Sequence, residues 1–120
     1  MSNPDLAGTA GSPSIIDCPI VIATSTTVSS EVDLNGTHLF AIGTPAALTG
    51  TAITFQVSDT GGGTFNALYD DSGTQYSVTV APSRVIYLDP SIFAAFRFLK
   101  LVSGSAESAN RTLKLYTRAV

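Results

Sequence analysis

Residues 51–82 read TAITFQVSDTGGGTFNALYDDSGTQYSVTVAP and carry the clearest pattern in the chain. Ile53, Phe55 and Val57 alternate with polar residues, which is the two-residue period of a strand with one buried face. The same period returns over residues 76–80. The segments DTGGG and DDSG lie between the apolar runs and are typical of turns. This stretch therefore predicts consecutive strands joined by turns, with a short middle strand in which Phe65, Ala67 and Tyr69 share one face.

The alternation continues toward the N-terminus. Residues 26–34 and 37–42 predict two strands, and Asn35-Gly36 between them is a strong signal for a two-residue hairpin turn. The side chains expected to share a face in each strand are Val28, Val32 and Leu34 in the first and His38, Phe40 and Ile42 in the second. Residues 15–22 predict either an edge strand or two short strand pieces, because Pro19 cannot donate to a central ladder.

The C-terminal third adds further strands over residues 84–88, 97–102 and 112–118. Asp89-Pro90 predicts the start of one short helix near residues 90–95, with Asp as N-cap and Pro at the first helical position. Turn signals every eight to twelve residues favour an all-β fold. We expect a single jelly-roll-like β-sandwich of eight or nine strands over residues 15–120, preceded by an extended N-terminal arm at residues 1–14.

Composition and charge restrict the functions that fit. The 120 residues carry a net charge of −3, which argues against a nucleic-acid partner. The charge is uneven: residues 1–83 hold seven acidic residues and no Lys or Arg, while residues 84–120 hold all six bases and two acids. The two signs either alternate between neighbouring strands or lie on different faces that orient neighbouring copies. No apolar run is long enough to span a membrane.

No set of residues in the sequence points to catalysis. His38 is the single histidine, and no Gly-x-Ser-x-Gly elbow presents a serine. Cys18 is the single cysteine, so no internal disulfide forms and a small buried residue is expected there. Asp59, Asp70 and Asp71 are best explained as solvated turn residues, with a surface calcium as the alternative. We therefore expect no enzyme activity, cofactor or metal.

The aromatic residues are expected mainly in the core. The phenylalanines at strand-face spacing are Phe40, Phe55, Phe65, Phe96 and Phe98. Tyrosine is favoured at interfaces, so one or two of the four tyrosines are expected at a contact surface. Lys114, Tyr116 and Arg118 alternate on one face of the last strand, opposite Leu113 and Leu115. A basic and aromatic stripe of this kind is a weak signal for binding a nucleic-acid strand.

Two stretches resemble known families. They are LTGTAITFQVSDTGGGTFNALYDDSGTQYSVTV at residues 48–80 and RVIYLDPSIFAAFRFLKLVSGSAESANRTLKLYTR at residues 84–118. Their Ser-Asp turn, Leu-Asp-Pro and aromatic-Leu-Lys-Leu strand resemble small virion proteins of tailed phages. The same stretches are similar to discoidin-type jelly rolls, from which this chain departs in lacking the tryptophan and the pair of end-joining cysteines. The second resemblance implies the topology, and no binding residue is carried over from it.

The first resemblance implies a structural protein of a phage particle, assembled in the host cytoplasm. The expected role is capsid decoration, in which the protein binds and stabilises the head lattice. Its partners would be the major capsid protein and copies of itself in a closed arrangement such as a trimer. Residues 1–22 are expected to make the main contact by adding a strand to a neighbour. The candidate interface residues are Ile15, Ile16, Ile20, Ile22, Lys114, Tyr116 and Arg118.

Two alternatives remain open at this stage. The first is a tail, baseplate or head-fibre component, which copy number per particle separates from decoration. The second belongs to another class, a carbohydrate-binding module, which binding to glycans would identify.

Overall fold

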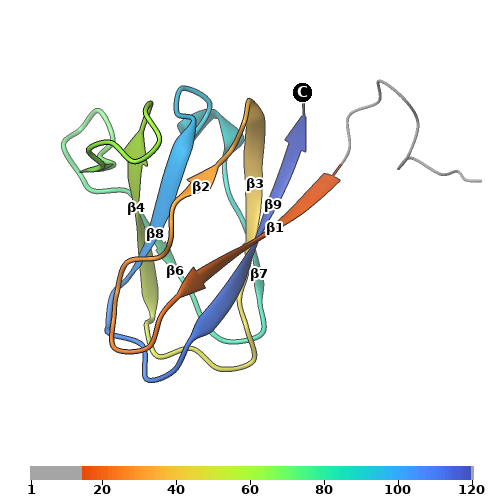
Figure 1. Ribbon diagram of the computed structural model, residues 1–120, viewed down its shortest axis with the longest axis vertical. Helices are drawn as coiled ribbons and strands as arrows, with labels where there is room; N and C mark the ends of the chain where they lie inside the picture. Colours follow the sequence, from red (N-terminus) through yellow and green to blue (C-terminus); the bar gives the residue numbers. More distant parts are fainter. Residues whose placement is uncertain (1–14, 120) are drawn as a thin grey trace, which may run out of the picture.

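The computed structural model describes the backbone of residues 15–119 and the side chains of residues 18–118, and it forms a β-sandwich (Figure 1). The arm expected at residues 1–14 lies outside the described residues. The strands are β1 (Ile15–Ile22), β2 (Val32–Asp33), β3 (Thr37–Gly43), β4 (Ala52–Ser58), β5 (Asn66–Ala67), β6 (Ser77–Thr79), β7 (Val85–Tyr87), β8 (Phe98–Ser103) and β9 (Arg111–Ala119). One short 3-10 helix, η1 (Pro90–Ile92), precedes β8.

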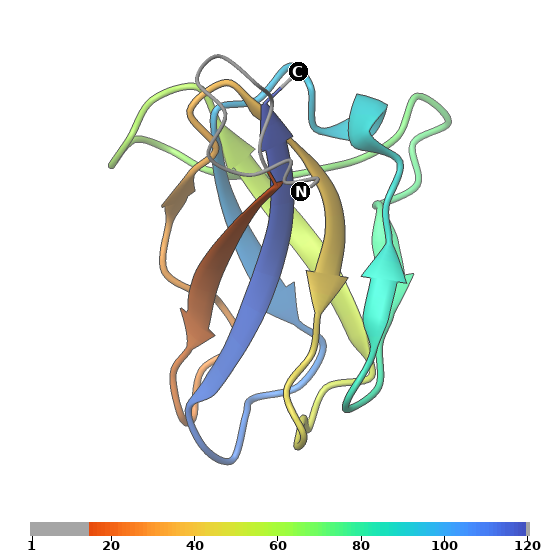
Figure 2. The ribbon, with the colours of Figure 1, turned by 90° about the vertical axis from the view of Figure 1, so that its right-hand side faces the viewer.

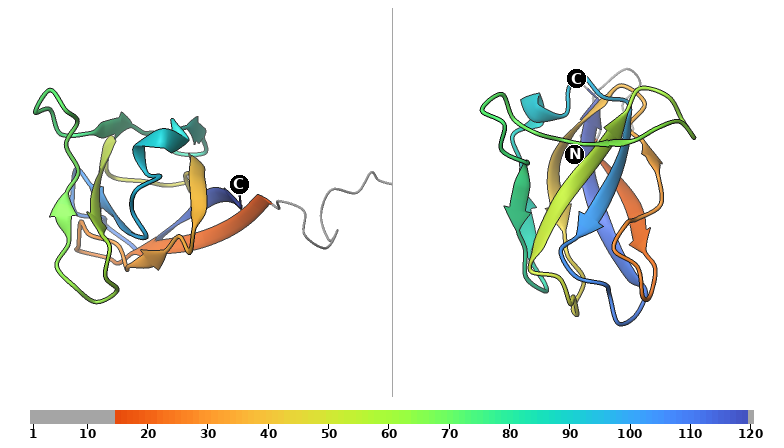
Figure 3. Two further views of the ribbon diagram at one scale, coloured as in Figure 1. Left: turned by 90° about the horizontal axis from the view of Figure 1, so that it is seen from above. Right: turned by 90° about the vertical axis from the view of Figure 1, so that its left-hand side faces the viewer.

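The strands form two antiparallel sheets that face each other (Figure 3, left). The first sheet has the order β1-β9-β3-β7, and Figure 2 looks onto its outer face. The second has the order β2-β8-β4-β5, with β6 also paired to β4, and it faces the viewer at the right of Figure 3. We call them the β9 sheet and the β8 sheet.

Strand pairing is nested along the chain. β1 pairs with β9, β2 with β8, β3 with β7, and β4 with both β5 and β6. The chain is therefore arranged as one long hairpin whose turn lies near residues 59–75. This hairpin is rolled up so that successive strand pairs belong alternately to the two sheets. This is the topology of a jelly roll, which confirms the expected fold class and the number of strands.

The core lies between the two sheets. β8 and β9 supply alternate buried leucines, Leu99 and Leu101 from one and Leu113 and Leu115 from the other, all fully buried. Phe55 of β4 packs against an aromatic pair from the loops, with ring centroids 5.5 Å from Tyr76 and 5.0 Å from Phe93. The remaining fully or nearly buried apolar side chains are Ile20, Ile22, Leu34, Leu39, Ile42, Ile53, Val57, Val80 and Leu88.

The turn at Asn35-Gly36 forms, but the hairpin predicted around it is wrong. Thr37 N donates to Leu34 O at 2.9 Å, and Asn35 and Gly36 both have positive φ, 51° and 77°, as a two-residue primed turn requires. The strands on either side belong to different sheets, because β2 pairs with β8 and β3 with β9 and β7. The turn is the corner where the chain crosses the sandwich, with Leu34 buried beneath it.

A bulge changes the face assignment in β3. Leu39 lies opposite Thr117 and Ala41 opposite Tyr116, so Phe40 is an extra residue in the ladder. As a result Leu39 and Ile42, three positions apart, are both fully buried, whereas His38 and Phe40 are only half-buried. The simple alternation expected for His38, Phe40 and Ile42 is therefore wrong.

The predictions for β1, for the short helix and for the phenylalanines agree with the structure in part. β1 is an edge strand with Pro19 opposite Lys114, as its proline predicted. The Asp89 carboxylate accepts from Ser91 N at 3.0 Å and caps η1, which is shorter than expected and ends at Ile92. Of the phenylalanines expected in the core, only Phe55 is fully buried, and Phe93, which was not among them, joins it.

Candidate interaction surface

The last strand places three predicted residues on the outside of the β9 sheet. Leu113, Leu115 and Thr117 point inward and are buried, so the alternate residues Lys114, Tyr116 and Arg118 line the outer face. Lys114 and Arg118 are exposed and Tyr116 is half-buried. The predicted placement is confirmed, and the role of these residues in binding a partner stays a prediction.

The Tyr116 ring lies down across the neighbouring strand, over Gly43. A Cβ atom built on Gly43 would meet both Cε2 and the hydroxyl of Tyr116 at 3.2 Å. Gly43 is therefore the position that lets the ring lie against the sheet. Lys114 Nζ lies 5.9 Å from the centroid of the same ring, within cation–π range. Tyr116 thus forms an aromatic floor beside a basic side chain.

Three large apolar side chains are exposed on the same outer face. Tyr87 is 76% exposed and Val85 66%, both on β7, and Val21 of β1 is 39% exposed. Ala41 of β3 lies opposite Tyr87 on one side and Tyr116 on the other. The two tyrosines therefore flank one small residue across three adjacent strands. The alternation of Val85 and Tyr87 was readable in the sequence, but their exposure was not, because apolar β residues are expected in a core.

Basic residues surround this apolar centre. Arg84 lines a surface hollow of about 330 Å³ together with Val85, Lys114 and Tyr116. Arg118 lies opposite His38 in the ladder and borders a second, more apolar hollow with Phe40 and Tyr116. One acidic residue, Asp17, occupies the register position opposite Tyr116 on β1.

The other bases are engaged elsewhere. Arg97 forms two hydrogen bonds of 3.0 Å with the Asp33 carboxylate and lies over the Phe98 ring. Lys100 Nζ lies 4.4 Å from the Phe65 ring centroid, and Arg111 pairs with Glu107. Glu31, Asp59, Asp70 and Asp71 lie in loops next to strands of the β8 sheet. The outer face of the β9 sheet is thus the more basic side, which supports the interpretation that the two signs lie on different faces.

The isoleucines of β1 require a correction. Ile20 and Ile22 were expected to anchor a partner, but they are 1% and 0% exposed and belong to the core of their own sandwich. The side chains of Ile20 and Ile22 face inward because β1 pairs with β9, whose leucines cover the same core. Ile15 and Ile16 are placed by their backbone only, opposite Arg118 and Thr117.

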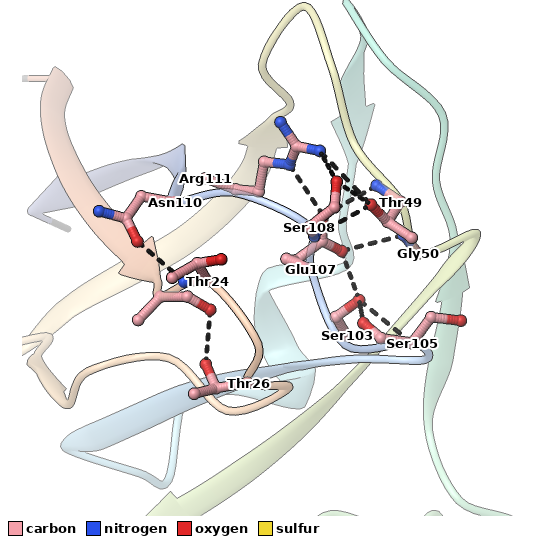
Figure 4. A network of polar contacts seen from close by, with 11 residues as sticks. Thr24, Thr26, Thr49, Gly50, Ser103, Ser105, Glu107, Ser108, Asn110 and Arg111 are labelled. Atoms are coloured by element: carbon pink, nitrogen blue, oxygen red, sulfur yellow. Dashed lines mark hydrogen bonds and ion pairs between the residues drawn. The ribbon is translucent and has the colours of Figure 1, made fainter.

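The most developed polar cluster lies at one end of the sandwich and is centred on Glu107 (Figure 4). The Glu107 side chain is fully buried. Its Oε1 accepts from Thr49 N at 2.8 Å and Arg111 Nε at 2.9 Å. Its Oε2 accepts from Gly50 N at 2.9 Å and Ser103 Oγ at 2.8 Å. All donors come from the chain itself, so the cluster ties the loop before β4 to the loop before β9.

The electrostatics of Glu107 agree with a structural role. Burial alone would raise the pKa of the carboxyl group. The hydrogen bonds from the two backbone amides, Arg111 and Ser103 outweigh burial and lower the pKa from 4.5 to about 2. A carboxylate that is ionised and fully hydrogen-bonded at neutral pH has no remaining capacity to act as a general acid or base.

The acidic turns offer no metal cluster in the described part of the chain. Across residues 15–119, no three His, Cys, Asp or Glu side chains gather in a way that could hold a metal ion. Asp70 Oδ1 accepts from Ser72 N, Ser72 Oγ and Thr74 N, and the hydroxyl of Ser72 contributes most to lowering the pKa of this carboxyl group. Asp70 therefore stabilises its own turn. Within the same residues there is no helix long and apolar enough to cross a bilayer.

Comparison with protein-family models, characterised proteins and solved structures finds no match to this chain. The resemblance to phage virion proteins therefore remains an expectation from the sequence.

Proposed function

We propose that this chain is a structural virion protein of a tailed phage that decorates the head, and that it docks on the capsid lattice through the outer face of its β9 sheet. The observation that carries the proposal is the exposed apolar and basic surface around Tyr87, Val85 and Tyr116. A contiguous exposed patch of large apolar residues bordered by polar ones is typical of a protein interaction site.

The composition of the surface favours a protein partner. Tyrosine and arginine are enriched in protein interfaces, and the exposed valines add apolar area that neither a sugar nor a phosphate backbone requires. The bases Arg84, Lys114 and Arg118 around the centre fit a partner whose contact surface is acidic at its rim.

The size of the face suits repeated binding. Four strands about 4.8 Å apart and about seven residues long give an area of roughly 400 Å². A standard stable interface buries about 800 Å² on each partner. A single copy would therefore bind weakly through this face alone. A lattice that offers many equivalent sites, or an oligomer that binds several of them, multiplies such an affinity.

The test is binding to phage heads from which the protein has been removed. Electron microscopy would compare the wild-type chain with Tyr87→Ala and Arg118→Glu, and with Tyr69→Ala as the control for an exposed tyrosine outside this face. We expect regular density at lattice positions for the wild-type protein and the control, and loss of density for the two face variants. Deletion of residues 2–14 would test the arm separately.

Two outcomes would contradict the proposal. Heads decorated equally by all variants would exclude the outer face of the β9 sheet as the docking surface. Wild-type protein that leaves stripped heads bare would exclude decoration, and binding to purified tails would then assign the chain to the tail or baseplate.

A further inference from the structure

A second concave site lies beside the end of β4, and none of its lining residues belongs to the outer face of the β9 sheet. It is a hollow of about 490 Å³ between the β4–β5 region and the segment after η1. Its apolar lining comes from Val57, which is buried, and from Leu68 and Phe96, which are half-buried and pack against the core. Tyr69 contributes an exposed ring, 56% accessible to solvent. The volume is in the range of small-molecule sites.

Polar groups without partners in the described chain converge on this hollow. Thr64, Asn66 and Tyr69 line it and are exposed to solvent, and the Thr64 hydroxyl, the Asn66 side-chain amide and the Tyr69 hydroxyl form no hydrogen bond with the rest of residues 18–118. Asp59 also lines it, and its carboxylate accepts one bond, from the Thr60 hydroxyl at 3.2 Å. The carboxylates of Asp70 and Asp89, by contrast, accept hydrogen bonds within their own turns, and that of Glu107 accepts them from the loop before β4.

The chemistry of these groups indicates the class of ligand. An amide and two hydroxyls both donate and accept, whereas a carboxylate only accepts. A ligand rich in hydroxyl groups can satisfy all of them. No base lines the hollow, and Asp70 and Asp71 follow in the next turn, so an anionic ligand would be repelled. The apolar lining and the Tyr69 ring require a ligand that also has an apolar face.

We propose that this hollow is a binding site for a neutral saccharide, because a sugar ring combines hydroxyl edges with an apolar C–H face. The site lies beside the β8 sheet, whereas the surface proposed to dock on the lattice is the outer face of the β9 sheet. The two can be occupied together, and the saccharide site does not rest on the proposed docking function.

The experiment is a titration of the full, ¹⁵N-labelled chain followed by amide chemical shifts. The probes are glucose, galactose, N-acetylglucosamine and their short neutral oligomers, with sialyllactose and glucuronic acid as anionic comparisons. We expect saturable shifts in residues 57–69 and 95–96 with at least one neutral probe. A small ligand in an open hollow is expected to bind with a Kd on the order of 1 mM.

Variants separate the site from non-specific contacts. Tyr69→Ala and Asn66→Ala should each weaken binding of that probe by about tenfold, the equivalent of one lost polar or aromatic contact. Tyr87→Ala, which removes an even more exposed tyrosine on the other side, should leave the Kd unchanged. The proposal is overturned if no neutral probe gives saturable shifts, if only the anionic probes bind, or if the two site variants bind as the wild type does.

Discussion

Replacing Glu107 by Gln tests the polar cluster that closes one end of the sandwich. In the wild-type chain each carboxylate oxygen accepts two hydrogen bonds, one from a backbone amide and one from a side chain. The substitution keeps the volume but turns one oxygen into an amide nitrogen, which donates. That nitrogen must then face a donor, and Arg111, whose side chain is only 14% exposed, loses its counter-charge.

The structure sets the size of the effect. Breaking a buried ion pair by neutralising one partner costs about 3–5 kcal/mol. A second route uses the pKa of Glu107, which folding lowers from 4.5 to about 2 because the hydrogen bonds outweigh burial. That difference corresponds to roughly 3 kcal/mol between the ionised and protonated forms. The two routes agree, and we expect Glu107→Gln to lower the free energy of unfolding by about 3 kcal/mol at pH 7.

The pH dependence has a defined sign. The pKa of Glu107 is lower in the folded than in the unfolded chain, so its contribution is fully present above pH 4.5. It is lost as the pH falls toward about 2, where the folded carboxyl group takes up its proton. The wild-type protein should therefore lose stability steeply over this interval, and the Glu107→Gln variant should lose less.

The assay is urea unfolding followed by far-ultraviolet circular dichroism at pH 7 and at steps down to pH 2.5. The control is Asp33→Asn, which breaks an ion pair whose side chains are 56% and 39% exposed and should cost less than about 1 kcal/mol. Equal losses for the two variants at pH 7, or an unchanged acid slope in Glu107→Gln, would refute the reasoning.

Three further substitutions test the fold. Gly36→Ala should cost about 1–2 kcal/mol by thermal unfolding because Gly36 has φ +77°, and a loss no larger than that of Gly62→Asn would contradict this cause. Phe93→Ala should cost about 3–5 kcal/mol in urea, since its fully buried ring contacts Phe55 and Tyr76, and a loss below about 1 kcal/mol would show that the loop packs independently of the core. Asp89→Ala removes the cap of η1 and should cost about 1 kcal/mol, with Asp71→Ala near zero as its control, and equal values would argue against capping.

Local patterns predicted most of the strands because each pattern depends on neighbouring residues, although the strand predicted over residues 26–34 is only Val32–Asp33 in the structure. Ile53, Phe55 and Val57 alternate into the core as expected, and Pro19 marks an edge strand. Asn35-Gly36 forms the turn that its dihedral preferences favour. These patterns could not predict the sheet to which each strand belongs. A two-residue turn has the same local geometry whether it joins two paired strands of one sheet or two strands of different sheets.

The candidate surfaces also combine features that the sequence predicted with features that only the tertiary structure shows. The sequence predicted that Lys114, Tyr116 and Arg118 share a face, because alternation along one strand needs no tertiary knowledge. It did not predict that Val85 and Tyr87 are exposed beside them, or that Tyr116 lies over Gly43, because those contacts join β3, β7 and β9 across long sequence separations. Tyr69 was expected on a strand face and forms a β-bridge with Gln75, but its position beside the hollow next to β4 was not predicted.

The sequence by itself determined that this is an all-β chain with an acidic N-terminal and a basic C-terminal part, because residue type and period are local properties. Only the tertiary structure decided which face each charge and each tyrosine occupies. The nested pairing of β1 with β9 turns Ile20 and Ile22 into the core, and the bulge at Phe40 changes the face that β3 presents. A shift of one residue in register reverses every side chain beyond it, so the surfaces exist only once the sheets have assembled.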